Sequence, residues 1–341
     1  MAKRTSISDV AKAAGVTVGV VSRVLNGDPK LQVRAETRER VLAAARSLNY
    51  TPNHAARAMR AGRSNAIGLA VHDVSNPVYG GVILGAQKAA TEAGYVLLLA
   101  DAEALARGHS TFRQAVHGGA IDGLLLLRAG NTADRRVLRE ALPRIPTVLV
   151  NDHSTTHASV ALDDTAGARI ATQHLIDLGH RRIGHLRAGG TARSGARLRG
   201  WREALHGAGI EEDPRWILDA EHLLETGHST MHRLAALDER PTAVFVANVL
   251  AGIGAMSAAR EAGLAVPGDL SLIAFHDVPY ADHLVPALST VAMPLHEVGA
   301  SGVALLLEQL SGGEPRHLVV DDPAPRLVLR GSTARPATGT P

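Results

Sequence analysis

From residue 66 onward, short apolar runs alternate with stretches of helical periodicity. The apolar runs are nearly continuous, which is typical of strands in a parallel sheet that helices cover on both faces. Such strands are predicted at residues 67–71, 95–99, 123–127, 147–150, 182–186, 243–247 and 270–275. Seven strand–helix units are more than a single doubly wound domain usually contains. The pattern therefore predicts an α/β body of two doubly wound parallel-sheet lobes.

The body is predicted to span residues 63–331, with the first crossing between lobes at about residues 161–164. Lobe one would comprise about residues 63–161 and 292–320, and lobe two about 162–291 and 321–331. The last ten residues, 332–341, are rich in Pro, Thr and Gly. We expect this tail to be disordered, because such a composition buries little apolar surface.

The first 50 residues show helical patterns instead. Ser6 and Asp9 have the spacing of a capping box, and Gly15 ends the helix that they begin. Thr17 can cap a second helix. A third helix is predicted over residues 35–48, with no Ser or Thr at its cap. Its inward side chains would be Val41, Leu42, Ala45 and Leu48.

Charge is divided unevenly along the chain. Residues 1–63 carry 12 lysines and arginines against four acidic residues, a net of +8. Residues 64–341 carry 24 against 29, a net of −5. A basic head on a mildly acidic body indicates a module that binds a polyanion, although a solvated basic tail fits the composition equally well.

The first two helices are joined by a tight glycine turn, and the second is polar along one stripe. This pattern is typical of a helix-turn-helix, an all-α DNA-binding head. On the second helix, Arg23 could pair with O6 and N7 of guanine, and Ser22 and Asn26 could bind phosphates. From these residues alone, a three-helix bundle that binds no DNA remains an alternative.

Several segments of the head closely resemble the LacI/GalR repressor family: ISDVA at 7–11, AGVTV at 14–18, VSRVLNG at 21–27, TRERV at 37–41 and LNYTPN at 48–53. The resemblance continues in the body through DVSNP at 73–77, LGHRRI at 178–183 and RLRGW at 197–201. It implies a repressor that binds a pseudo-palindromic double-stranded operator as a homodimer, without a cofactor. It also implies a body similar to a periplasmic sugar-binding protein, with a small-molecule effector between the lobes.

The resemblance also divides the N-terminal region. Residues 1–52 would form the helix-turn-helix domain, and residues 53–62 a hinge helix that enters the minor groove. Met59 stands where most relatives carry a leucine that wedges between base pairs. The side chains expected to contact DNA are Ser6, Thr17, Val18, Gly19, Ser22, Arg23, Asn26, Tyr50, Asn53, His54, Ala56, Met59 and Arg60.

Ligands of doubly wound lobes bind outside the carboxyl ends of the parallel strands. Polar residues at those ends, together with two positions that relatives use for effector contact, Tyr79 and Arg197, form the expected effector site. Its members are Asp73, Tyr79, Arg128, Asn151, Arg197, Asn248, His276 and Asp277. Val249 and His276 stand where relatives commonly have carboxylates that anchor sugar hydroxyls.

The chemical class of the effector stays open between three possibilities. Losing two carboxylates while keeping Arg128, Arg187 and Arg197 favours an anion, such as a sugar acid or sugar phosphate, because arginine forms paired bonds with anions. A neutral sugar and a nucleoside-like ligand stacked on Tyr79 are the alternatives.

Other classes of protein are disfavoured. The chain has no cysteine, which excludes a disulfide-stapled fold and thiol catalysis. It has no run of 18 apolar residues and no signal-peptide pattern, so we expect a cytoplasmic protein without a membrane segment. No nucleophile or dinucleotide motif supports the rival interpretation as an enzyme. The pairs His153–His157 and His228–His232 have metal-ligand spacing, but without a recognisable third ligand they predict no metal site.

Overall fold

The computed structural model describes residues 5–25, 28, 30–50, 63–107, 109–129, 131–154, 156–189 and 192–337, with only the backbone described at 109–111 and 192. The chain divides into two compact units, Met1–Ser64 and Asn65–Pro341. The predicted hinge, residues 53–62, lies outside the described residues. So do the predicted DNA contacts Asn26, Asn53, His54, Ala56, Met59 and Arg60.

The head consists of α1 (Ile7–Ala14), α2 (Val18–Leu25) and α3 (Ala35–Ser47). Ser6 and Asp9 form the predicted capping box, and Gly15 ends α1 in the left-handed conformation at φ 65°. The Oγ1 atom of Thr17 accepts from the backbone N–H of Val20 at 3.4 Å, as expected of a cap. The helices enclose a small core of Val10, Ala11, Ala14, Val21, Val24, Val41, Ala44 and Ala45.

One inward position of α3 was predicted wrongly. Leu42 is 36% exposed, whereas Val41, Ala44 and Ala45 are buried. Successive helical residues are about 100° apart, so the residue next to Val41 lies off the buried stripe. The residue before the helix, Arg34, provides no side-chain cap, as its sequence predicted.

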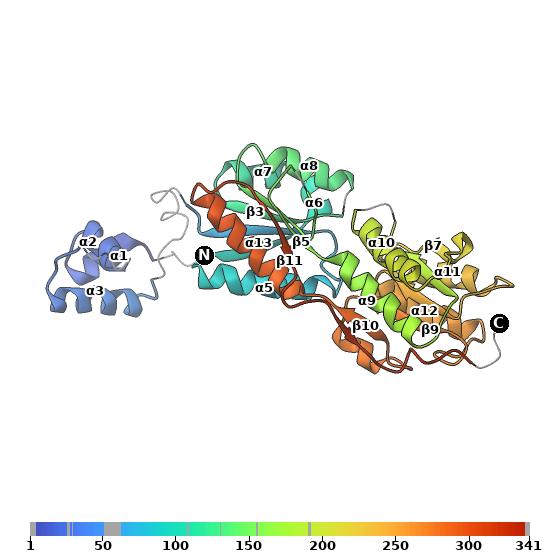
Figure 1. The fold of residues 1–341 in the computed structure, drawn as a ribbon. Helices are drawn as coiled ribbons and strands as arrows, with labels where there is room; N and C mark the ends of the chain where they lie inside the picture. The colour runs from blue at the N-terminus through green and yellow to red at the C-terminus, as the bar shows by residue number, and fades with distance from the viewer. Residues whose placement is uncertain are drawn as a thin grey trace. The chain divides into compact units, whose positions relative to one another are not determined.

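The body contains two six-stranded sheets (Figure 1). The first has the order β11-β5-β4-β3-β1-β2, and all of its strands are parallel. The second has the order β12-β10-β9-β8-β6-β7 and is parallel except for β12. The strands are β1 (Ala66–Val71), β2 (Val96–Asp101), β3 (Gly123–Leu127), β4 (Thr147–Val150), β5 (Ser159–Leu162), β6 (Ile183–Arg187), β7 (Ile217–Asp219), β8 (Ala243–Val246), β9 (Ser271–Phe275), β10 (Ser289–Ala292), β11 (His317–Val320) and β12 (Arg326–Val328).

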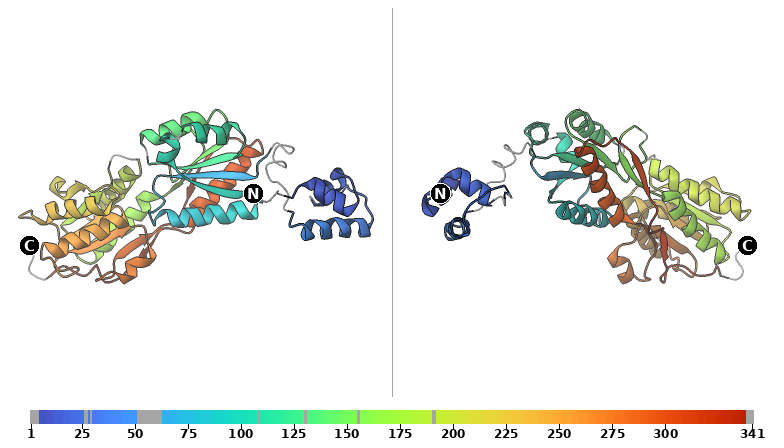
Figure 2. Two further views of the ribbon diagram at one scale, coloured as in Figure 1. Left: turned by 180° about the vertical axis from the view of Figure 1, so that it is seen from behind. Right: turned by 60° about the vertical axis from the view of Figure 1, so that its left-hand side comes forward.

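Helices lie on both faces of each sheet (Figure 2). In lobe one they are α5 (Tyr79–Glu92), α6 (Ala102–Arg107), α7 (His109–His117), α8 (Thr132–Ala141) and α13 (Leu295–Leu310). In lobe two they are α9 (Asp164–Asp177), α10 (Ala192–Gly207), α11 (Leu224–Ala235) and α12 (Val249–Glu261), with short turns η1 (Pro214–Trp216) and η2 (Pro279–His283). The predicted fold class is confirmed.

Alternate strand residues supply the two cores of lobe one. Leu125 and Leu127 of β3 pack with α5 and α13 in the larger core. Leu124 and Leu126 pack with α6, α7 and α8 in a separate one. Side chains of a strand alternate between faces, so a continuous apolar run is what a doubly covered sheet requires.

The predicted disorder of the C-terminal tail is wrong for residues 332–337. Ser332 is fully buried; its Oγ donates to the carbonyl of Leu272 at 2.6 Å and accepts from the N–H of Ser289 at 2.8 Å. Ala334 binds Ser271 and His180. The prediction rested on composition, which indicates how much apolar surface a segment can bury. These hydrogen bonds, and not apolar burial, hold the segment on lobe two. Residues 338–341 lie outside the described residues.

Across the described ranges, no helix is both long and apolar enough to span a bilayer.

Candidate functional site

The outward face of α2 is accessible in the head. Thr17, Gly19 and Arg23 are exposed, and Ser22 is half-buried. Val18 is half-buried and packs against the core of the head, so only part of its side chain can reach a base. This face therefore offers polar and small side chains where a helix-turn-helix presents its recognition surface.

Arg23 is held by an acidic neighbour. Its Nε donates to Oδ2 of Asp28 at 2.8 Å, and the other carboxylate oxygen of Asp28 accepts from the N–H of Lys30 at 2.8 Å. The hydrogen bond from Arg23 lowers the pKa of Asp28, so the carboxylate stays charged at neutral pH. Because the Arg23 side chain is 50% exposed, it can exchange this partner for a base or a phosphate.

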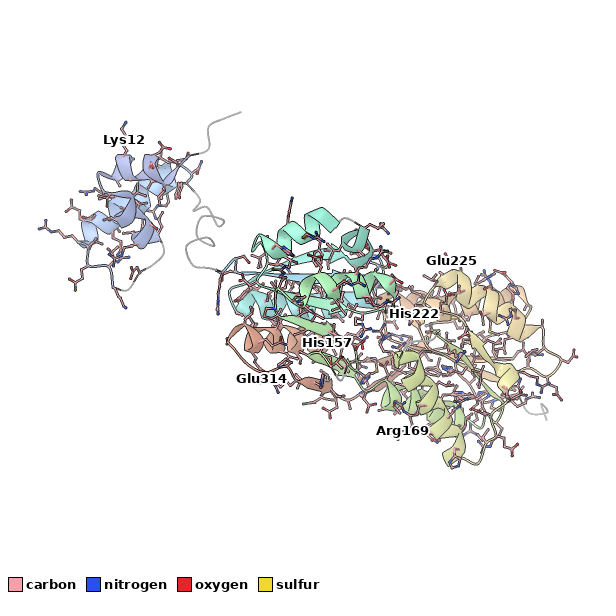
Figure 3. All side chains as sticks on the ribbon, turned by 90° about the horizontal axis from the view of Figure 1, so that it is seen from above. Lys12, His157, Arg169, His222, Glu225 and Glu314 are labelled. Carbon is pink, nitrogen blue, oxygen red and sulfur yellow. The ribbon has the colours of Figure 1, made fainter. Side chains whose placement is uncertain are left out.

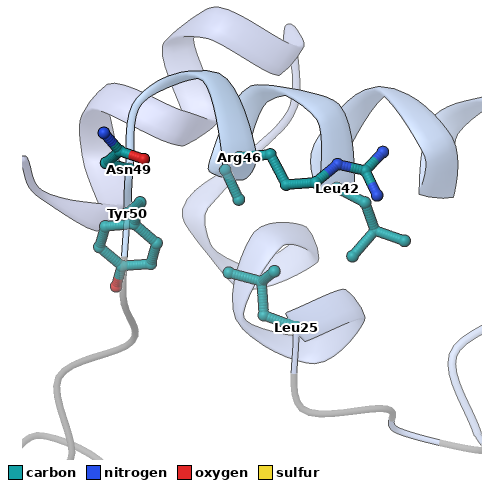
Figure 4. Close-up of a pocket in the computed structure, with 6 residues that line it drawn as sticks. Leu25, Leu42, Arg46, Asn49 and Tyr50 are labelled. Carbon is teal, nitrogen blue, oxygen red and sulfur yellow. The ribbon is translucent and has the colours of Figure 1, made fainter.

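A groove of about 650 Å³ lies on the head beside the end of α2 (Figure 4). Apolar and polar side chains both line it: Leu25, Leu42, Ala45, Arg46, Asn49 and Tyr50. Tyr50 was predicted to contact DNA, and here it packs against the core of the head. The predicted contact Ser6 is exposed, although its hydroxyl also serves the capping box.

In the body, Arg197 on α10 is buried and makes contacts from all three of its nitrogens. Nε donates to Oδ1 of Asp164 at 2.8 Å, and Nη1 donates to the carbonyl of Ala247. Nη2 lies 3.1 Å from Nε2 of His276. The guanidinium carbon also lies 4.1 Å from the ring centre of Phe275. A buried charge is tolerated only with such a set of partners.

These contacts define the protonation of His276. A guanidinium has only donors, so Nε2 of His276 must accept and the neutral ring carries its proton on Nδ1. Burial lowers the pKa of His276 well below its usual value, and the charges of Arg197 and Arg193 lower it further. Neither Nδ1 of His276 nor Oδ2 of Asp164 has a hydrogen-bond partner in the described structure. His276 thus keeps one buried donor, and Asp164 one buried acceptor, without a partner.

Arg193 connects the two lobes. It lies four residues before Arg197 on α10 and donates to the carbonyl of Asn151, after β4 of lobe one, at 2.7 Å. Asn151 is buried, adopts a left-handed φ of 55°, and has no partner for Oδ1. Arg193 was not among the predicted effector residues, although its i, i+4 spacing from Arg197 places the two on one face of a helix.

Tyr79 at the start of α5 and His222 before α11 lie in the same electrostatic environment. Burial raises the pKa of Tyr79, while Arg193 acts to lower it. Burial lowers the pKa of His222 to about 3, and Arg197 and Arg193 lower it further. Figure 3 labels His222 on the side of lobe two that faces lobe one. No local sequence pattern pointed to this histidine.

A second polar cluster occupies the strand ends of lobe one. Nε2 of His72 lies 2.6 Å from Oδ1 of the fully buried Asp134. Burial acts to lower the pKa of His72, but the hydrogen bonds and charges of Asp134 and Glu103 outweigh it and raise the pKa. Arg128 pairs with Asp152 at 3.3 Å. Arg128 is therefore held by a carboxylate of its own lobe.

Other predicted effector residues already have structural partners. Asp277 accepts from Thr290 at 2.6 Å and pairs with Arg330 at 2.9 Å. Asn248 caps α12 by accepting from the N–H of Leu250 at 2.8 Å. The remaining member, Asp73, accepts from the backbone N–H of Ser75. Arg187, which the anion hypothesis also used, pairs with Asp219. The structure thus brings Arg197 and His276 into contact. Arg193 bonds Asn151 and acts on Tyr79 and His276 through its charge.

Comparison with known proteins decides the family. Residues 6–53 match the model for bacterial regulatory proteins of the lacI family, and residues 172–333 match that for a periplasmic binding protein-like domain. The HTH-type transcriptional repressor PurR of Photobacterium profundum is 31% identical over 332 residues, covering 96% of this chain and 98% of the relative. The chain belongs to the lacI family of bacterial regulatory proteins.

Other lacI-family proteins are also similar to this chain over nearly its whole length. The HTH-type transcriptional repressor CytR of Escherichia coli (strain K12) is 33% identical over 336 residues, covering 96% of each chain. A crystal structure of the lac repressor dimer bound to operator and the anti-inducer ONPF has a TM-score of 0.83 at 26% identity, covering 97% of this chain and 100% of that one. This lacI-family chain is a transcriptional regulator with a DNA-binding head and an effector-binding body.

Proposed function

We propose that this regulator represses transcription as a homodimer on a pseudo-palindromic operator. We further propose that a small, uncharged, hydroxyl-rich metabolite, such as a neutral sugar, binds between the lobes and controls operator affinity. The observation that carries the second proposal is the cluster of Arg197, Asp164 and His276.

The two residues that contact the Arg197 guanidinium carry opposite hydrogen-bonding groups. Oδ2 of Asp164 can only accept, whereas Nδ1 of the neutral His276 can only donate, and both lack a partner. A hydroxyl group donates and accepts, so one or two hydroxyls of a ligand satisfy both atoms. Unpaired buried polar atoms cost about 1–3 kcal/mol each, so their satisfaction favours a bound state.

The three arginines on which the anion hypothesis relied give it little support. Arg197 is neutralised by Asp164, Arg128 by Asp152, and Arg187 by Asp219. An anionic group close to the unpaired Oδ2 of Asp164 would be repelled. The neutral sugar, an alternative in the sequence analysis, is therefore preferred to the sugar acid or phosphate. A solved relative, described as the transcriptional regulator CelR in complex with cellobiose, has a TM-score of 0.70 at 31% identity, covering 96% of this chain and 100% of that one.

The contact between Arg193 and Asn151 supports control through the lobes. It ties α10 of lobe two to the end of β4 in lobe one, so a ligand at Arg197 can bias the closure of the lobes. A ligand that changes operator affinity must bind the two states of the body differently, and the operator must change ligand affinity by the same factor.

A thermal-shift and calorimetric screen of the full chain tests the effector. Neutral sugars, sugar acids, sugar phosphates and nucleosides are compared. A neutral sugar is expected to stabilise the parent chain but not Asp164→Asn or His276→Gln. Stabilisation by sugar acids or phosphates alone would overturn the proposal, and a nucleoside would favour stacking on Tyr79.

Gel shifts with the native upstream region test the regulatory role. Operator affinity is expected to change when the ligand found in the screen is added and to fall steeply with salt, because phosphate contacts release counterions. Light scattering of the full chain should give twice the 35.7 kDa of one chain. A monomer on and off DNA would contradict the homodimer.

A further inference from the structure

A cluster of potential metal ligands lies on lobe two between α11 and α12, which run side by side. Nε2 of His228 and Nε2 of His232, both on α11, lie 2.9 Å and 3.0 Å from the same oxygen, Oε2 of Glu261 on α12. The ligand atoms of all three residues lie within 4.8 Å of one another. The spacing of the histidines was visible in the sequence, but Glu261 is supplied by the packing of the next helix.

The packing of the two helices fixes this geometry. A Cβ on Gly227 would overlap the backbone of Ala251, and a Cβ on Gly254 would overlap the carbonyl of Leu224. The two glycines therefore allow the backbones of α11 and α12 to touch. Histidines at i and i+4 share one face of α11, and the close packing presents that face to the end of α12.

The surroundings suit a metal ion better than an isolated ion pair. The side chains of His228, His232 and Glu261 are 34%, 40% and 45% exposed, so an ion can enter from solvent. The second carboxylate oxygen of Glu261 accepts from Ser257 at 3.1 Å, which orients the carboxylate as an outer-shell partner does. An exposed ion pair contributes little stability by itself, whereas one cation would satisfy both imidazoles and the carboxylate.

We propose that His228, His232 and Glu261 bind one Zn²⁺ ion, with water in the fourth position. Two histidines and one glutamate form a known zinc donor set in which the fourth site stays open. The ion would link α11 to α12 and stabilise lobe two. This site is separate from the effector proposal and does not depend on it.

Calorimetric titration of the full chain tests the proposal. The chain carries no polyhistidine tag and is first treated with a chelator, and Zn²⁺ alone is the probe. We expect one Zn²⁺ per chain and a rise in the melting temperature. In His228→Ala, His232→Ala and Glu261→Gln, the affinity should fall by more than the roughly 10–100-fold that loss of an outer-shell partner costs.

Two further variants make the test decisive. The double variant His153→Ala/His157→Ala removes a pair of the same spacing that lies outside any helix, and it should bind Zn²⁺ like the parent. His232→Cys replaces one ligand by a thiolate, so its Co²⁺ complex should gain a sulfur-to-metal charge-transfer band. Equal Zn²⁺ affinity in the parent and the three single variants, or loss of binding in the His153/His157 control, would overturn the proposal.

Discussion

Nη2 of Arg197 lies 3.1 Å from Nε2 of His276, a contact between residues 79 positions apart in the chain. The arginine can only donate, so the contact exists only while His276 is neutral. Protonating the ring would place two positive charges face to face in a buried site. The pair therefore links the shape of the proposed effector site to the pH of the solution.

Stability should fall as the solution is acidified. The pKa of His276 lies well below 6.5 in the folded chain and that of His222 is about 3, so below pH 6.5 the unfolded chain binds more protons. Each such group contributes stability that is complete above its unfolded pKa of about 6.5 and decreases below it by up to about 1.4 kcal/mol per pH unit. Urea unfolding at pH 7.5 and 5.5 measures this difference.

His276→Gln should reduce that pH dependence, because it removes one of the groups that must stay neutral. His206→Gln removes an exposed imidazole and is the matched control. If the two variants kept the same pH dependence as the parent, the buried neutral His276 would not contribute as argued.

Removing one partner of the Arg197–Asp164 pair should be more harmful than removing both charges. Arg197→Met leaves Asp164 buried without its cation, and loss of one partner of a buried pair costs about 3–5 kcal/mol. The double variant Arg197→Met/Asp164→Asn should recover part of this free energy of unfolding. A double-mutant cycle in denaturant measures the coupling, and additive effects would be evidence against it.

Substituting either partner of the Arg23–Asp28 pair should change DNA binding, in opposite directions. Asp28→Asn frees Arg23 and removes a negative charge, so affinity should rise on all DNA sequences. Arg23→Ala should relax the preference at one base pair by about 1–3 kcal/mol. Binding assays on the operator and on single-base variants separate the two outcomes. A uniform loss on every sequence would make Arg23 a phosphate contact only.

Replacing each of two glycines of α5 by alanine should have different effects on the stability of the body. A Cβ on Gly85 would overlap the backbone carbonyl of His296 at the start of α13, so Gly85→Ala should destabilise the body by about 1–3 kcal/mol. A Cβ on Gly80 meets nothing within 4 Å, so Gly80→Ala should be neutral or stabilise by about 0.4–1 kcal/mol. Thermal and urea unfolding of the two variants compare them within one helix.

Much of the fold could be predicted from local sequence. Every strand expected from an apolar run is present within one or two residues, and α1 begins and ends at Ser6 and Gly15 as predicted. Strands β5, β7, β10, β11 and β12, each of three or four residues, were not predicted. Runs this short carry little periodicity that distinguishes a strand from a loop, although the equally short β4 and β8 were predicted from their apolar runs.

Sequence by itself determined the alternation of strands and helices, the helix-turn-helix head and its basic charge, because caps, turns and apolar runs act within a few residues. Only the tertiary structure decided which charges cancel. By sequence alone Arg128, Arg187 and Arg197 are available for an anion, but each meets a carboxylate from another segment: Asp152, Asp219 and Asp164. In the same way, Glu261 joins His228 and His232 only because α11 packs on α12. Such partners are separated by tens of residues, and the packing of whole elements, not local propensity, brings them within hydrogen-bonding distance.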